Sequence, residues 1–150
     1  MKNLPQHLAT LSVTAWVGSL WAIGYLAVPV LFHTQDDRHL AGMMAGKLFV
    51  TSGYLALFCG IYLLGYHTFK SGILAFRQRQ FQIISGMLLI ALFLQFGINP
   101  LMNDLKTLVL PFDIMDSAYA GQFKILHGIS SIAYLTESLL GILLVIQNRQ

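Results

Sequence analysis

The residue best suited to chemistry in this sequence is Glu137, an acid in the middle of a long apolar segment. An ionised carboxylate inside a membrane is costly, and acids at such positions commonly serve proton or cation movement. A neutral carboxyl group can instead hydrogen-bond a neighbouring helix, and Tyr62, Trp16 and Trp21 are candidate donors. The sequence therefore predicts for Glu137 either a proton or cation site or a polar link between helices.

Three histidines, His33, His39 and His127, fall near the ends of apolar segments, on what we expect to be one side of a membrane. Imidazoles with aspartates nearby can ligate a transition metal or a haem iron, so haem or copper is the cofactor that they would suit. Their spacing forms no motif, because they belong to separate segments. Cys59 is the only cysteine, which excludes a Cys-x-x-Cys site. We assign no catalytic residue, since the sequence has neither a nucleophile elbow nor a glycine-rich phosphate loop.

The composition indicates a membrane protein. Of 150 residues, nine are Lys or Arg, six are Asp or Glu and 56% are apolar, and the mean hydropathy is +0.67. Soluble domains typically carry about 25% charged residues, whereas this chain has 10%. The cations form no basic patch with interleaved aromatic residues, so we expect the lipid bilayer, and no nucleic acid, as a partner.

Four apolar stretches are long enough to cross a hydrocarbon core about 30 Å thick. They cover residues 8–32, 48–69, 81–101 and 125–146. These stretches predict an all-α integral membrane protein, a single domain over residues 1–150 folded as an antiparallel four-helix bundle. Asp37 can cap the second helix, which then begins well before its span. The pair Asn99-Pro100 predicts that the third helix ends near Asn99.

The charged residues outside these stretches sort by side. One side carries cations and no acid: Lys2, Lys70, Arg77, Arg79 and Arg149. The other side carries all five aspartates together with Arg38, Lys47, Lys106 and Lys124. Because short cytoplasmic loops are enriched in Lys and Arg, we expect both termini to lie in the cytoplasm.

Polar and small residues predict which face of a membrane helix is packed. On the fourth helix one face holds His127, Ser130, Ser131, Tyr134, Glu137, Ser138 and Gly141. On the first helix the corresponding stripe is Gly18, Trp21, Tyr25 and Pro29. We expect both faces to point into the bundle.

The first helix and its exit also carry a resemblance. They read Trp16-Val-Gly-Ser-Leu-Trp21, Gly24-Tyr25-Leu-Ala-Val-Pro29 and Arg38-His-Leu-Ala41-Gly42, and Phe123-Lys-Ile-Leu-His127-Gly-Ile-Ser130 opens the last helix. Together these segments resemble the uncharacterised bacterial membrane family related to transmembrane protein 205, the domain of unknown function 4149. The resemblance implies a four-span protein of the bacterial inner membrane with no established reaction. It also implies a site where the outer ends of the first, second and fourth helices meet.

Our leading hypothesis is a non-enzymatic membrane protein. In this hypothesis the protein binds a partner protein or a small ligand at its outer face. Its signature residues there are Trp21, Arg38, His127 and Ser130. In this hypothesis Arg38 contacts an anion, and His127 hydrogen-bonds or titrates.

Two alternatives stay open. One is a membrane redox protein that holds haem or copper with His127 and with His33 or His39. The other is a proton or cation permease that uses Glu137. Because four spans enclose little room for a pore, this permease would be a homo-oligomer.

Overall fold

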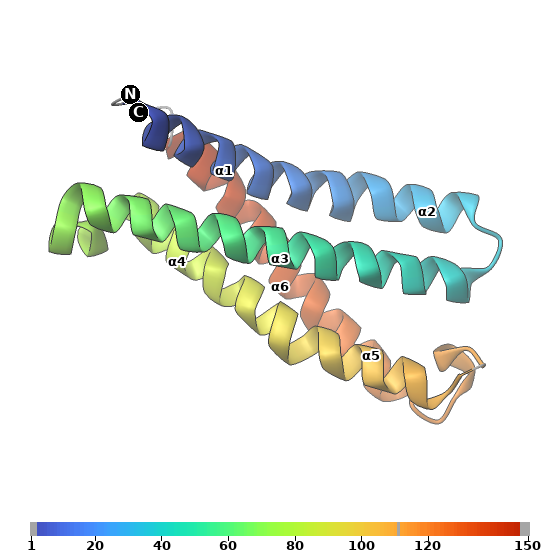
Figure 1. Ribbon diagram of the computed structural model, residues 1–150. Coiled ribbons are helices and arrows are strands. Elements are labelled where there is room, and N and C mark those ends of the chain that lie inside the picture. The colour runs from blue at the N-terminus through green and yellow to red at the C-terminus, as the bar shows by residue number, and fades with distance from the viewer. Residues whose placement is uncertain (1–2, 111, 148–150) are drawn as a thin grey trace.

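A computed structural model describes residues 3–110 and 112–147, and every element in this part of the chain is helical. Four helices are long and apolar enough to cross a membrane: Leu4–Thr34, Arg38–Arg77, Arg79–Leu108 and Ala120–Gln147. Each expected span lies within one of them. Successive helices reverse direction, and the first begins at the end of the molecule where the last one finishes (Figure 1). The predicted all-α helical bundle is confirmed.

We call the end of the bundle that holds residues 35–37 the outer end and the end that holds Leu4 and Gln147 the inner end, while the orientation in a membrane stays a prediction. The first membrane helix contains a π-helical turn in its outer half. It comprises α1 (Leu4–Ala22), the π segment η1 (Ile23–Ala27) and α2 (Val28–Thr34). Pro29 lacks a backbone N–H, and in a regular α-helix its ring clashes with the carbonyl four residues earlier. The wider π turn just before this proline accommodates the ring, so the helix continues.

The third membrane helix repeats this arrangement, with α4 (Arg79–Leu92), the π segment η3 (Phe93–Ile98) and α5 (Asn99–Leu108). The prediction that it ends near Asn99 is therefore wrong. Pro100 stands in the first turn of α5, where its missing N–H costs little because the preceding π turn has already changed the hydrogen-bond pattern. The helix extends ten residues beyond η3 and carries Lys106 with it.

The second membrane helix, α3 (Arg38–Ser71), is a single element of 34 residues. The Asp37 carboxylate caps its start by accepting the backbone N–H groups of His39 at 2.9 Å and Leu40 at 3.1 Å. The expected start near Asp37 is thus confirmed. At about 1.5 Å per residue the helix is about 50 Å long, so it extends beyond a hydrocarbon core.

Two short 3₁₀ segments and the last membrane helix complete the chain. The 3₁₀ segment η2 (Gly72–Arg77) joins α3 to α4, and Gly72 adopts a φ of 56°, which a glycine tolerates best. The 3₁₀ segment η4 (Ile114–Asp116) precedes α6 (Ala120–Gln147).

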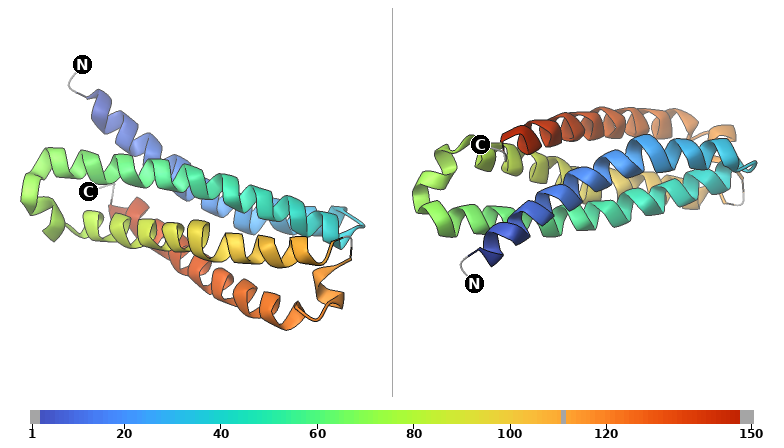
Figure 2. Two further views of the ribbon diagram at one scale, coloured as in Figure 1. Left: turned by 60° about the horizontal axis from the view of Figure 1, so that its bottom comes forward. Right: turned by 90° about the horizontal axis from the view of Figure 1, so that it is seen from above.

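The four membrane helices form a ring of contacts: α1 packs on α3, α3 on α4, α4 on α6, and α6 on α1. Figure 2 shows α6, at the red end of the colour range, along one side of the molecule. The largest side chains buried inside this ring are Trp16, Leu63, Ile84, Met87 and Leu144. Close packing needs small residues, as at Gly60, where a Cβ would lie 2.7 Å from Leu88.

The prediction of which face of the first helix points into the bundle is wrong. Its residues Gly18, Trp21, Tyr25 and Pro29 are all exposed. The buried face comprises Val13, Trp16, Val17 and Leu20 instead. The rings of Trp and Tyr combine an apolar body with a polar tip, so they are stable at a lipid-facing surface and mark packing poorly.

The predicted face of the fourth helix is correct in one half and wrong in the other. In the inner half Glu137, Ser138 and Gly141 are buried. In the outer half His127 and Ser131 are exposed, because α6 there meets α5 and η4 and buries Phe123 instead.

Candidate functional site

Glu137 is 2% exposed and lies in the core beside the first helix. Its Oε1 atom accepts a hydrogen bond of 3.0 Å from the indole Nε1 of Trp16, which is fully buried. Of the three candidate donors, Trp16 is the one that contacts the carboxyl group. The bond joins α1 to α6 and gives this acid a structural partner at mid-bundle.

Tyr134, one turn outward from Glu137, fits into the break in the first helix. Its hydroxyl donates to the Leu20 carbonyl at 2.7 Å, and the same carbonyl also accepts the backbone N–H of Ile23 at the end of α1. The Tyr134 ring lies so close to Gly24 that a Cβ there would overlap it. The hydroxyl therefore ties α6 to the backbone of the first helix at the start of its π turn.

An aromatic cluster surrounds this contact. Trp21 packs on Tyr25 with ring centroids 4.8 Å apart, and the Tyr134 ring lies 6.3 Å from Tyr25 and 5.2 Å from Phe49. The cluster links α1, η1, α6 and α3. Trp21, a predicted site residue, thus packs on Tyr25 of the same membrane helix and stays exposed at the edge of this cluster.

At the outer end, Lys106 of α5 projects between α3 and α6. Its Nζ atom donates to the Gly42 carbonyl at 3.1 Å and lies 5.4 Å from the centre of the Phe123 ring. Asp113 attracts this half-buried ammonium electrostatically, but its carboxylate also accepts the Met115 backbone N–H at 2.8 Å. Lys106 therefore places a positive charge inside the outer end of the bundle.

Two predicted site residues lie near the groups that Lys106 contacts. The His127 ring stacks on Phe123 with an interplanar angle of 12° and centroids 6.1 Å apart. Arg38 lies four residues before Gly42 on α3, and residues at this spacing share one helix face. Lys106 and Phe123 thus connect His127 to α3 at Gly42, one turn from Arg38, and a site that includes Arg38 and His127 stays a prediction.

Ser130, the remaining predicted residue, donates to the carbonyl of His127 at 2.8 Å, and Ser131 donates to the same carbonyl. Both hydroxyls thus bond to their own helix. The oxygen of each hydroxyl can still accept a hydrogen bond on this side of α6.

The histidines do not converge. His33 lies exposed in the last turn of α2, and His39 lies in the first turn of α3. Over residues 3–110 and 112–147, no three His, Cys, Asp or Glu side chains form a group that could hold a metal ion. Haem or copper binding by His33, His39 and His127 stays a prediction.

Sequence reasoning missed Lys106, Tyr134 as a backbone partner, and the role of Gln95. Gln95 is buried in η3, donates to the Val50 carbonyl at 3.2 Å, and accepts from the Asn99 side chain at 3.4 Å. The signal available in the sequence was the position of each proline: a proline inside a long apolar run indicates a broken backbone that polar side chains must satisfy.

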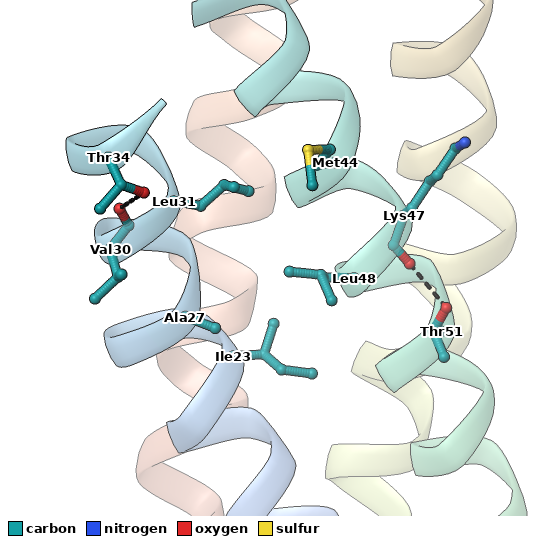
Figure 3. Close-up of a pocket in the computed structure, with 9 residues that line it drawn as sticks. All are labelled: Ile23, Ala27, Val30, Leu31, Thr34, Met44, Lys47, Leu48 and Thr51. Carbon is teal, nitrogen blue, oxygen red and sulfur yellow. Dashed lines mark hydrogen bonds between the residues drawn. The ribbon is translucent and has the colours of Figure 1, made fainter. Parts of the chain in front are cut away.

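An apolar groove of about 590 Å³ lies between the first helix and α3 (Figure 3). Its walls include Ile23, Leu31 and Leu48, and the Lys47 ammonium points away from it. The hydroxyls of Thr34 and Thr51 each donate to their own helix at 2.9 Å. The groove therefore suits a hydrocarbon chain and has little to orient a polar ligand.

The model of the domain of unknown function DUF4149 matches residues 11–108. The chain belongs to this family. The match includes the segment from Trp16 to Gly42 on which the resemblance was noted, and it ends before Phe123 and His127. No curated protein and no solved structure matches the chain.

Membership of the DUF4149 family identifies no reaction, because the family is defined by an unknown function. The matched region covers the first three membrane helices, including both π segments, Arg38 and Lys106. The evidence for a function of this DUF4149 protein therefore lies in its own side chains and their contacts.

Proposed function

We propose that this DUF4149 protein is a non-enzymatic membrane protein that binds a small anionic amphiphile at the outer end of its bundle. The observation that carries the proposal is Lys106, whose ammonium is half-buried among three helices and contacts a carbonyl and an aromatic ring. The carbonyl and the ring carry no full negative charge, and Asp113, which attracts the ammonium, also accepts the Met115 backbone N–H. A carboxylate or phosphate would add a charge-assisted hydrogen bond to this ammonium.

The neighbours of Lys106 support an anion with an apolar body. Arg38 adds a second cation on the same face of α3, and His127 adds a ring nitrogen that can donate. Phe123 offers an apolar ring between them. We infer a ligand whose acidic group contacts Lys106 and whose chain lies along the lipid-facing side of α6.

The test compares dodecanoate with the uncharged dodecanol as probes, using the full chain purified in dodecyl maltoside. We expect dodecanoate to raise the melting temperature more than dodecanol does. Lys106→Gln should weaken dodecanoate binding about tenfold, the effect of one charged hydrogen bond. Lys124→Gln is the matched control, since Lys124 is an exposed lysine of α6.

Equal dodecanoate affinity in the Lys106→Gln and Lys124→Gln variants would overturn the proposal. So would equal stabilisation of the wild-type chain by dodecanoate and dodecanol. Capture of a protein that requires His127, without any effect of dodecanoate, would favour the alternative of a partner protein at the same face.

We also propose that the protein lies in a bacterial inner membrane with both termini in the cytoplasm. The absence of acids beside Lys70, Arg77 and Arg79 supports cytoplasmic termini, and the family resemblance supports a bacterial inner membrane. The redox and permease hypotheses stay predictions. A Soret band or bound copper in the purified protein would favour the first, and proton or cation flux lost in Glu137→Gln would favour the second.

A further inference from the structure

A second cavity lies at the opposite end of the bundle, the end that we expect to face the cytoplasm. It has a volume of about 250 Å³ and lies among α1, α3, α4 and α6. Its polar lining consists of Gln6, Thr10, Tyr66, His67, Lys70 and Gln80. The apolar floor is formed by core residues such as Leu63 and Ile84, which are almost fully buried.

Lys70 gives this inner cavity a positive charge. Its Nζ atom lies 5.7 Å from the centre of the Tyr66 ring, which holds the ammonium beside the cavity wall without neutralising it. No acidic residue is among the described residues that line the cavity. Another cation, Arg79 at the start of α4, lies at the same end of the bundle. The electrostatic field here favours an anion.

The cavity wall is fixed by hydrogen bonds that leave other donors available. The Gln80 side chain donates to the Gln147 carbonyl at 2.8 Å and joins α4 to the end of α6. Thr10 donates to the Gln6 carbonyl at 3.1 Å within α1. The Lys70 ammonium has three N–H groups, and the Tyr66 hydroxyl and the Gln6 amide are further donors in the lining.

The size of the cavity limits the ligand. Sites for drug-sized molecules have volumes of about 300–1,000 Å³, so a cavity of about 250 Å³ suits a smaller group. Basic pockets between membrane helices on the cytoplasmic side bind anionic lipid headgroups. A compact anion with several acceptor oxygens matches a lysine surrounded by neutral donors.

We propose that this inner cavity binds a phosphate group, with Lys70 as its charge partner and Gln6 and Tyr66 as neutral donors. The phosphate belongs either to the headgroup of an anionic phospholipid or to a soluble phosphate. The proposal is independent of the outer site, because its residues lie at the other end of the bundle.

The experiment uses the full chain in dodecyl maltoside with two phosphate probes. Native mass spectrometry measures binding of phosphatidylglycerol against diacylglycerol, which has the same chains and no phosphate. A thermal melt measures binding of inorganic phosphate against chloride at equal ionic strength. The variant is Lys70→Gln, and the matched control is Arg77→Gln, an exposed cation of the adjacent η2 segment.

We expect phosphatidylglycerol to bind better than diacylglycerol and to lose about tenfold in affinity in Lys70→Gln but not in Arg77→Gln. A Lys70-dependent effect of inorganic phosphate alone would identify the soluble source. Because Lys70 is exposed, Lys70→Gln should fold, and far-UV circular dichroism checks this. Gln6→Leu, a second exposed lining position, should weaken the same probe.

The proposal is overturned if Lys70→Gln and Arg77→Gln bind both probes alike. Lys106→Gln separates the two sites: it should lose dodecanoate and retain phosphatidylglycerol. Loss of both ligands in either lysine variant would contradict independent sites.

Discussion

The indole nitrogen of Trp16 donates to a carboxyl oxygen of Glu137 at 3.0 Å, which ties the first membrane helix to the last. Both side chains are almost fully excluded from solvent. In a membrane protein such a bond contributes about 1–2 kcal/mol at most, so its larger effect is on specificity. It fixes the rotation of α6 relative to α1, and this rotation brings Tyr134 to Gly24 one turn further outward.

We predict that Trp16→Phe lowers the free energy of unfolding by about 1–3 kcal/mol, since it leaves the carboxyl group without its donor. Chemical unfolding in dodecyl maltoside, followed by far-UV circular dichroism, measures the loss. Trp21→Phe is the matched control, because Trp21 is an exposed tryptophan on the same helix.

A double-mutant cycle with Glu137→Gln isolates the bond itself. Glu137→Gln should destabilise the Trp16→Phe variant less than it destabilises the wild-type chain. Additive effects would mean that the two side chains contribute independently, in conflict with the observed contact.

A second prediction concerns the tyrosine inserted beside η1. Gly24→Ala should destabilise the protein by about 1–3 kcal/mol, because the new methyl group overlaps the Tyr134 ring. Gly18→Ala, in the same helix and with open space at its Cβ, should be neutral or slightly stabilising because alanine favours helix. Melting temperatures measure both changes.

The cause of the Gly24 effect can be checked separately. In a Tyr134→Ala background the ring is absent, and Gly24→Ala should then cost nothing. A persistent loss would show that glycine is needed there for a reason other than the ring.

Much of the fold follows from features that a single chain reports directly. The lack of charge over each apolar stretch locates the membrane helices, and Asp37 marks a helix start because its side chain caps adjacent N–H groups. The prediction for the third helix is wrong at Pro100 because a proline in an apolar run indicates a disturbed helix but does not show whether the helix ends or continues through a π turn. The spacing of residues along the first helix does not show which of Trp16 and Trp21 is buried. Trp16 is the one that faces Glu137 of the last helix, and this contact is not visible in the sequence of one helix.

The candidate site was predicted only in part, for a related reason. The sequence indicates Arg38 and His127, and the structure adds Lys106, which contacts Gly42 one turn from Arg38 and the Phe123 ring on which His127 stacks. The sequence predicts Lys106 only as a charged residue of the connection between the third and fourth helices, because Asn99-Pro100 predicts that the third helix ends before it. Its placement between α3 and α6 depends on the continuation of that helix past Pro100.

A third prediction tests the start of α3. Asp37→Ala should lower stability by about 0.5–2 kcal/mol through loss of the two capping hydrogen bonds at the helix start. Asp36→Ala removes the same charge one residue earlier and should have little effect, since Asp36 is not the capping residue. Equal losses of stability in the two variants would indicate that the negative charge, and not the capping hydrogen bonds, stabilises the helix start.

The last prediction concerns orientation, which determines which proposed site faces which compartment. In a Cys59→Ala background, single cysteines are introduced by Gln35→Cys, between α2 and α3, and by Gln78→Cys, between η2 and α4. A membrane-impermeant maleimide added to intact cells should label Gln35→Cys and spare Gln78→Cys, because the cations of the second connection favour the cytoplasm. Both variants should be labelled after permeabilisation, which controls for access to each thiol. The opposite pattern would move Lys70 and its cavity to the outer face and would place the Lys106 site in the cytoplasm.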